Sequence, residues 1–170
     1  MIEFEIADVR FSEELVQFWR ESFLAAYVDI HTKENIEAYF DESYTLEEAN
    51  NVLSSEIHFC LKALRDQETV GVAIVAHQKC PLLENLIASE LKQLYLLPSE
   101  YGSGLAYQMM EEVFRRIKGE EKEYVWLNVS KKNPRAQKFY QKIDFEMVGG
   151  GDDIHVGSEV LPSQIMIRRI

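Results

Sequence analysis

The stretch that decides the fold is Leu94–Ala106, LYLLPSEYGSGLA, in which an apolar strand stops at Pro98 and a glycine-bearing helix follows. Gly102 and Gly104 let the backbone approach a ligand closely, and the unpaired N–H groups of the first helical turn point outward with the helix dipole behind them. Such a helix start suits a pyrophosphate. A plain turn between strand and helix uses glycine as well, so this motif needs a second landmark.

A second junction of strand and helix follows where the apolar run Tyr124–Val129 precedes Asn133 and Pro134. Asn133 is suited to cap a helix, and Pro134 is suited to be its first residue, where a missing N–H does no harm. Apolar and aromatic residues then recur at helical spacing, at Ala136, Phe139, Tyr140 and Ile143. The simplest interpretation of Tyr140 is an aromatic ring packed against the sheet.

The two junctions together resemble the GNAT superfamily of acyl-CoA-dependent N-acetyltransferases, and the resemblance covers the region from about Glu90 to Gly149. In that family the pattern Gln/Arg-x-x-Gly-x-Gly/Ala holds the pyrophosphate of coenzyme A. The segment Tyr101–Ala106 matches the pattern at Gly104 and Ala106. Tyr101 stands where the family has Gln or Arg. The contact that a Gln or Arg side chain makes to the pyrophosphate is therefore not expected here, whereas the contacts from backbone N–H groups are.

The family's second pattern is Asn-x-x-Ala-x-x-Phe-Tyr followed by Gly-Phe. It is met by Asn133, Ala136, Phe139 and Tyr140, with Asp144-Phe145 in place of Gly-Phe. A more diffuse likeness, around Glu37-Ala38-Tyr39-Phe40 and Val125-Trp126-Leu127, is to bacterial polyamine (spermidine/spermine) acetyltransferases. The resemblance therefore implies acetyl-CoA as cosubstrate, and a polyamine or other small cationic primary amine as acceptor, acetylated by direct attack in a ternary complex.

The resemblance also implies roles for individual residues. Those expected to bind the cofactor are Leu96, Leu97, Tyr101, Gly102, Ser103, Gly104, Leu105, Ala106, Asn133, Ala136 and Tyr140. Tyr140 is the expected proton donor to the departing thiolate, and a backbone N–H near Leu96 is expected to stabilise the oxyanion. Glu90 is the candidate base, because a free alkylamine, with a pKa of about 10.4, is charged near neutrality. An exposed strand glutamate is the plainer interpretation of Glu90.

The acceptor is expected to lie against the segments 27–44 and 149–164. The rings of Tyr27 and Tyr39 would attract a cation, as would the acidic residues Asp29, Glu34, Asp41, Glu42, Asp152 and Asp153. Two alternatives stay open, namely a peptide or protein N-acetyltransferase and a non-catalytic acyl-CoA-binding module. A dinucleotide-binding oxidoreductase is disfavoured, because no third glycine completes GxGxxG and no ribose-binding acid follows the next strand.

Composition favours one domain over residues 1–170, because a chain of 46% hydrophobic residues builds one buried core and is too short for two ordinary domains. No run of about 18 apolar residues and no N-terminal signal segment occurs, so we expect a cytoplasmic protein with no membrane contact. Cys60 and Cys80 suit reduced thiols rather than a disulfide or metal site. The net charge of −11 disfavours nucleic acid as a partner, and a homodimer is left open.

Basic residues gather in one stretch that contains no acid, at Lys131, Lys132, Arg135, Lys138 and Lys142. This stretch coincides with the second junction, where the phosphates of coenzyme A need positive partners. A solvated helix face explains it equally well. The histidines, His31, His58, His77 and His155, are scattered, and we interpret each as a surface or packed residue rather than a catalyst.

Alternating patterns predict strands over 2–6, 57–63, 70–76, 90–97, 124–129, 145–148 and 164–167. Helices are predicted to start at Ser12, Thr45, about Gly102 and Asn133, with a connector through Tyr27–Tyr39 and a mobile loop at 149–153. The order β-α-α-β-β-β-α-β-α-β-β predicts an α/β fold of the α+β mixed-sheet kind, with helices on both faces. In GNAT folds the two parallel strands splay apart and the pantetheine arm lies between them.

Overall fold

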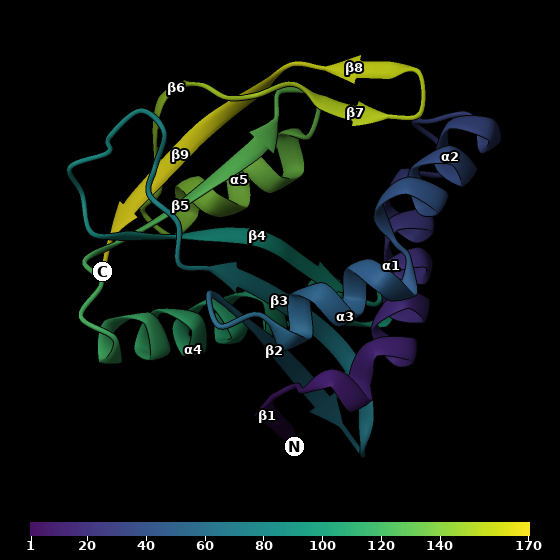
Figure 1. The fold of residues 1–170 in the computed structure, drawn as a ribbon, viewed down its shortest axis with the longest axis horizontal. Helices are drawn as coiled ribbons and strands as arrows, with labels where there is room; N and C mark the ends of the chain where they lie inside the picture. Colours follow the sequence, from purple (N-terminus) through teal and green to yellow (C-terminus); the bar gives the residue numbers. More distant parts are fainter.

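The computed structural model describes residues 1–170 and contains a seven-stranded mixed sheet in the order β1-β2-β3-β4-β5-β9-β6, with a separate β7–β8 hairpin (Figure 1). The elements in chain order are β1 (Ile2–Ile6), η1 (Val9–Phe11), α1 (Ser12–Tyr27), α2 (Lys33–Ser43), α3 (Leu46–Ser54), β2 (His58–Arg65), β3 (Glu68–Ala76), β4 (Ala88–Leu96), η2 (Pro98–Glu100), α4 (Leu105–Gly119), β5 (Tyr124–Ser130), α5 (Pro134–Lys142), β6 (Glu146–Gly150), β7 (Ile154–Val156), β8 (Glu159–Leu161) and β9 (Ser163–Arg169).

Helices cover both faces of the sheet, as predicted. On one face α1 and α3 form a core with the sheet, in which Trp19 packs with Ile74. On the other face α4 buries Met109 in a core that includes Val75. The inward stripe of α4 consists of Leu105, Met109, Val113 and Ile117, which are all buried.

Two predicted helix starts are confirmed by their caps. The Thr45 hydroxyl accepts a hydrogen bond from the Glu48 N–H at 3.1 Å, and Asn133 Oδ1 accepts one from the Ala136 N–H at 3.0 Å. The predicted start at Ser12 agrees with the bounds of α1, but Ser12 does not cap the helix, because Phe11 occupies the N-cap position and Asp8 caps the preceding η1. The Ser12 hydroxyl instead donates to the Val9 carbonyl at 2.7 Å.

Three segments differ from the sequence-based expectation. The expected connector contains the helix α2, which buries only Ile36 and so lacks an apolar stripe. The expected mobile loop is partly strand, because Gly149 and Gly150 of β6 pair with Ile165 and Gln164 of β9. The hairpin of β7 and β8 was not predicted, since each strand has three residues.

The left-handed backbone positions explain several chain reversals. Asp66 and Gln67, with φ of 53° and 70°, form the two-residue turn between β2 and β3. The helix α4 ends at Gly119, but the left-handed residue that follows is Glu121 rather than the glycine.

The sheet parts between β4 and β5. These parallel strands are paired only at Ala88↔Tyr124, Ser89↔Val125 and Glu90↔Trp126. A bulge in the pairing of β3 with β4 leaves Lys92 without a partner, and bulges bend a strand and strengthen its local twist. Beyond Glu90 the two strands therefore diverge, β4 toward α1 and β5 toward the β7–β8 hairpin (Figure 1).

Candidate active site

A cleft of about 330 Å³ lies where β4 and β5 diverge. Its walls come from β4, β5, the N-terminal end of α5, the C-terminal part of α1, α2 and the β7–β8 hairpin. The side chains in these walls that can form hydrogen bonds or exchange protons with a ligand include Tyr27, His31, Glu90, Gln93, Asn133 and Tyr140. The fold thus brings Glu90 and Tyr140, the predicted base and acid, to one cleft.

The start of α4 presents free amides to solvent. Gly102 and Gly104 have φ of 80° and 85°, and a Cβ on either would meet nothing within 4 Å, so the backbone conformation and not crowding calls for glycine. The Ser103 hydroxyl accepts the Leu105 N–H at 3.2 Å, while the N–H groups of Gly102, Gly104 and Ala106 have no partner in the protein. Open space in front of unpaired amides at a helix N-terminus fits a pyrophosphate.

A cation stands beside these amides. The guanidinium carbon of Arg135, at the start of α5, lies 4.0 Å from the centroid of the Tyr101 ring. Tyr101 therefore holds an arginine of another helix next to the position where the GNAT pattern has its own Gln or Arg. Of the other basic residues in this stretch, Lys132 lines the cleft and Lys138 is exposed on α5.

Tyr140 is held in place by the end of α5. The Phe145 N–H donates to the Tyr140 carbonyl at 3.0 Å and the Asp144 N–H to the Gln141 carbonyl at 3.2 Å, which is a Schellman motif with Asp144 left-handed at φ 62°. The Phe145 ring lies edge-on to Tyr140 at 5.5 Å. The Tyr140 hydroxyl makes no hydrogen bond in the protein, and burial raises the pKa of the phenol, so it stays protonated.

Glu90 is the last residue of β4 that pairs with β5, and its side chain is 12% exposed. Its Oε2 lies 3.4 Å from Lys92 Nζ. Glu90 is thus a mostly buried carboxylate in the cleft wall rather than the exposed strand residue of the plainer interpretation.

The predicted residues of α5 and α1 meet across the cleft. Asn133 caps α5 with its Oδ1 and donates from Nδ2 to the Tyr27 hydroxyl at 3.1 Å. Tyr39 lines the cleft and stacks on Phe23 at 4.8 Å. Burial is the main cause that raises the pKa of both Tyr27 and Tyr39, so both phenols are neutral.

Leu96 and Leu97 differ in what their backbones offer. The Leu97 N–H donates to the Val70 carbonyl at 3.0 Å, and the Leu97 carbonyl accepts the Glu100 N–H. Because successive N–H groups of a strand point to opposite sides, the Leu96 N–H points away from β3, toward the side that β5 has left. Only Leu96 of this pair has an N–H available to an oxyanion.

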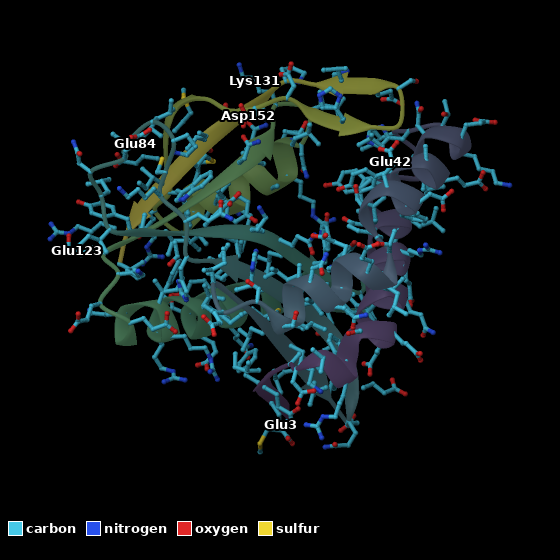
Figure 2. The ribbon with its side chains drawn as sticks, in the orientation of Figure 1. Glu3, Glu42, Glu84, Glu123, Lys131 and Asp152 are labelled. Carbon is cyan, nitrogen blue, oxygen red and sulfur yellow. The ribbon has the colours of Figure 1, made fainter.

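The acidic residues expected around the acceptor lie elsewhere. None of Asp29, Glu34, Asp41, Glu42, Asp152 and Asp153 lines the cleft. Glu42 and Asp152, both labelled in Figure 2, are exposed, and the Asp152 backbone carbonyl accepts hydrogen bonds from Asn128 and Ser163. This expectation was therefore wrong.

Two polar residues of the cleft escaped sequence analysis. Gln93 Oε1 is buried without any hydrogen-bond donor. His31 is buried as a packed residue would be, but it also lines the cleft and contacts Glu159. No spacing rule singles out either residue, because their importance depends on neighbours that are distant in sequence.

Metal ligation and membrane insertion have no counterpart in the structure. His, Cys, Asp and Glu side chains nowhere gather in a group of three or more that would hold a metal ion. None of the helices combines the length and apolar character needed to cross a bilayer. Cys60 and Cys80 are free and buried.

Comparison with solved structures gives the same fold. The PaiA N-acetyltransferase from Thermoplasma acidophilum, in complex with coenzyme A, superposes with a TM-score of 0.80 at 22% identity over 100% of this chain and 99% of that one. A probable acetyltransferase from Staphylococcus epidermidis superposes with a TM-score of 0.78 at 13% identity over 99% of both chains. The predicted GNAT-like fold is confirmed.

Sequence comparison extends this from fold to family. An uncharacterized N-acetyltransferase of Mycobacterium tuberculosis is 27% identical over 159 residues, which cover 94% of this chain and 97% of that protein. Residues 17–145 match the acetyltransferase (GNAT) family. The chain therefore belongs to the GNAT family and is an acetyl-CoA-dependent N-acetyltransferase.

Proposed function

We propose that this enzyme acetylates a primary nitrogen of a small cationic amine, with a polyamine as the leading candidate. The observation that carries the proposal is the buried, unpartnered Gln93 Oε1 in the wall of the cleft. A buried acceptor without a donor costs free energy, and a bound ammonium or amine N–H would remove that cost.

The rest of the cleft supports a cationic amine of limited size. Glu90 adds a carboxylate to the wall that contains Gln93, and the rings of Tyr27 and Tyr39 offer aromatic faces. A volume of about 330 Å³ is at the lower end of the range for small-molecule sites. A folded peptide or protein acceptor would reach the cleft only with an extended side chain.

The donor has a matching place. The free N–H groups of Gly102, Gly104 and Ala106, with Arg135 beside them, would hold the diphosphate of acetyl-CoA, which supplies an activated acetyl thioester. The divergence of β4 from β5 would admit the pantetheine arm toward Tyr140. Ser103, Leu105, Ala136 and Leu97 would contribute by shaping the two helix starts and the strand end.

In the transfer, Glu90 would take a proton from the acceptor ammonium, directly or through water, which frees the nitrogen lone pair. A C–N bond forms and the C–S bond of the thioester breaks, while the Leu96 N–H would stabilise the carbonyl oxygen as it becomes negative. As the C–S bond breaks, the attacking nitrogen would lose its second proton to water, which leaves a neutral amide. Tyr140 would give its proton to the leaving thiolate and would be reprotonated from solvent. Holding both substrates together removes the need for a covalent enzyme intermediate.

The test measures thiol release from acetyl-CoA with spermidine, spermine, amino acids and lysine-containing peptides as acceptors. We expect turnover with the polyamines and a fall in kcat/KM of about tenfold for them in Gln93→Leu, because the acceptor loses one hydrogen bond. The Gln93→Leu protein should be as stable as the wild type or more so, since a buried unpaired atom is removed. Turnover with peptides alone would overturn the proposal.

A further inference from the structure

His31, in the turn between α1 and α2, lines the cleft. The β7–β8 hairpin lies beside α2 at this end of the molecule (Figure 1). Its side chain is 2% exposed. Nδ1 lies 2.9 Å from Glu159 Oε2 at the start of β8, whereas Nε2 has no hydrogen-bond partner in the protein. Nδ1 is therefore held by a carboxylate, whereas Nε2 is available to a ligand bound in the cleft.

Glu159 is itself held in place by α2. Its Oε1 accepts a hydrogen bond from Asn35 Nδ2 at 2.8 Å, and Asn35 Oδ1 accepts bonds from the Ser158 N–H and hydroxyl at 2.9 and 3.0 Å. Gly157 turns the hairpin with φ of 57°, and a Cβ there would collide with Asn35. The turn is thus shaped so that the hairpin closes tightly on α2 and brings Glu159 to His31.

The pair has a definite hydrogen-bonding polarity. The hydrogen bonds from Asn35 and His31 lower the pKa of Glu159, so its carboxylate is ionised and acts only as an acceptor. His31 must then donate from Nδ1, which leaves the lone pair on Nε2 when the ring is neutral. In that neutral tautomer Nε2 is the hydrogen-bond acceptor of a residue that lines the cleft.

A purely structural role leaves part of this arrangement unexplained. The bonds between Asn35 and Ser158 already join the hairpin to α2 without a titratable group. Burying an imidazole beside a carboxylate carries a desolvation cost that a neutral contact avoids. The centroid of the Tyr27 ring lies 5.9 Å from that of His31, so an aromatic face that attracts cations flanks the same spot.

We propose that His31, held by Glu159, forms a subsite for a second amino group of the acceptor, so that the enzyme prefers acceptors with two amines over those with one. The inference rests on the proposed function, in which Glu90 and Gln93 receive the reacting nitrogen. His31 then receives the distal nitrogen from the opposite end of the acceptor. In this arrangement His31 is a specificity-determining residue and takes no part in proton transfer.

Two substitutions separate the subsite from the contact with the hairpin. In Glu159→Gln the new amide NH₂ faces Nδ1, so the ring proton moves to Nε2 and the acceptor in the cleft becomes a donor. His31→Asn keeps a donor near the position of Nδ1 but has no atom where Nε2 lies. The control is Ser158→Ala, which removes a hydrogen bond of the hairpin to Asn35 and leaves His31 and Glu159 unchanged.

The experiment measures kcat/KM for α,ω-diamines and for alkylamines of matched chain length. We expect the wild type and Ser158→Ala to prefer the best diamine by about tenfold, and Glu159→Gln and His31→Asn to lose that preference while their kcat/KM for the alkylamine is unchanged. ω-Amino acids of the same length are included, because Lys132 also lines the cleft and would favour a carboxylate.

The outcomes separate the two levels of the proposal. Equal use of diamines and alkylamines by the wild type overturns the subsite and leaves the proposed function standing. The subsite is also overturned when the two variants lose activity on both classes in parallel with their melting temperature, or when ω-amino acids are preferred. Failure of the wild type to acetylate any of these amines overturns the proposed function, and the subsite with it.

Discussion

Replacement of Tyr140 by Phe removes one hydroxyl and leaves the surrounding packing in place. The Tyr140 ring contacts Phe139 at 5.3 Å and Phe145 at 5.5 Å, and Phe preserves both contacts. The hydroxyl has no hydrogen-bond partner in the protein, so we expect the free energy of unfolding to change by no more than about 0.5 kcal/mol. General acids contribute about a hundredfold or more to turnover, so a fall in kcat of at least about tenfold is expected.

The assay is acceptor-dependent thiol release under saturating acetyl-CoA and spermidine, with thermal unfolding measured on the same samples. Tyr124→Phe is the matched control, because Tyr124 is at the start of β5 and does not line the cleft. An unchanged kcat in Tyr140→Phe, at an unchanged melting temperature, would refute the role of Tyr140 as proton donor. A parallel loss in the control would instead point to packing.

The pH dependence of the wild type follows from the same environment. Burial raises the pKa of Tyr140 above the ordinary value of 10.0. The phenol therefore stays protonated where a solvent-exposed tyrosine begins to ionise, and kcat should not fall through its ionisation as the pH rises to about 10. The raised pKa means that the folded state favours the neutral phenol. The contribution of Tyr140 to the free energy of unfolding is therefore constant below the pKa that this tyrosine has in the unfolded chain, and it decreases as the pH rises above that value.

Three further changes have defined outcomes. Arg135→Ala should raise the KM for acetyl-CoA by about tenfold, and it should leave the KM for acetyl-pantetheine, which has no diphosphate, unchanged. The control Lys138→Ala should alter neither KM. Equal effects of Arg135→Ala on both donors would contradict a phosphate contact. Asp144→Gly should stabilise the protein by about 0.5–1 kcal/mol in urea unfolding, because glycine adopts φ of 62° without strain, and destabilisation would contradict this. Cys60, whose thiol pKa burial raises to about 12, and the buried Cys80 should react with a thiol reagent only in denaturant, so modification of the native protein would disprove their burial.

The parts of the fold that were predictable are those in which a local residue type fixes a local conformation. Asn133 followed by Pro134 strongly favours a helix start, and α5 begins there. Gly104 precedes α4 with a φ of 85°, a conformation that disfavours residues with a side chain. The strand segments of the sheet followed from alternation of apolar residues. The helix α2 was not predicted, because only Ile36 among its residues is buried and the sequence therefore has no periodic apolar stripe there.

The side of the cleft proposed to bind the acceptor was less predictable, because the roles of its residues depend on contacts with residues that are distant in sequence. His31 and Glu159 are separated by 128 positions, and neither belongs to a recognisable spacing. Gln93 differs from any other strand glutamine only in that its Oε1 finds no donor once the chain is folded. Conversely, acidic residues such as Glu42 were prominent in the sequence and yet are exposed and do not line the cleft.

The β7–β8 hairpin forms a two-stranded sheet of its own, outside the seven-stranded one. It reaches α2 through the side chains of Asn35, Ser158 and Glu159 rather than through a shared ladder of backbone bonds. The donor, by contrast, is proposed to bind the main-chain N–H groups at the start of α4, with Arg135 beside them. In this proposal acceptor choice and donor binding depend on separate parts of the fold, and exchanging the hairpin would offer a route to redirect this scaffold toward other amines with its donor site intact.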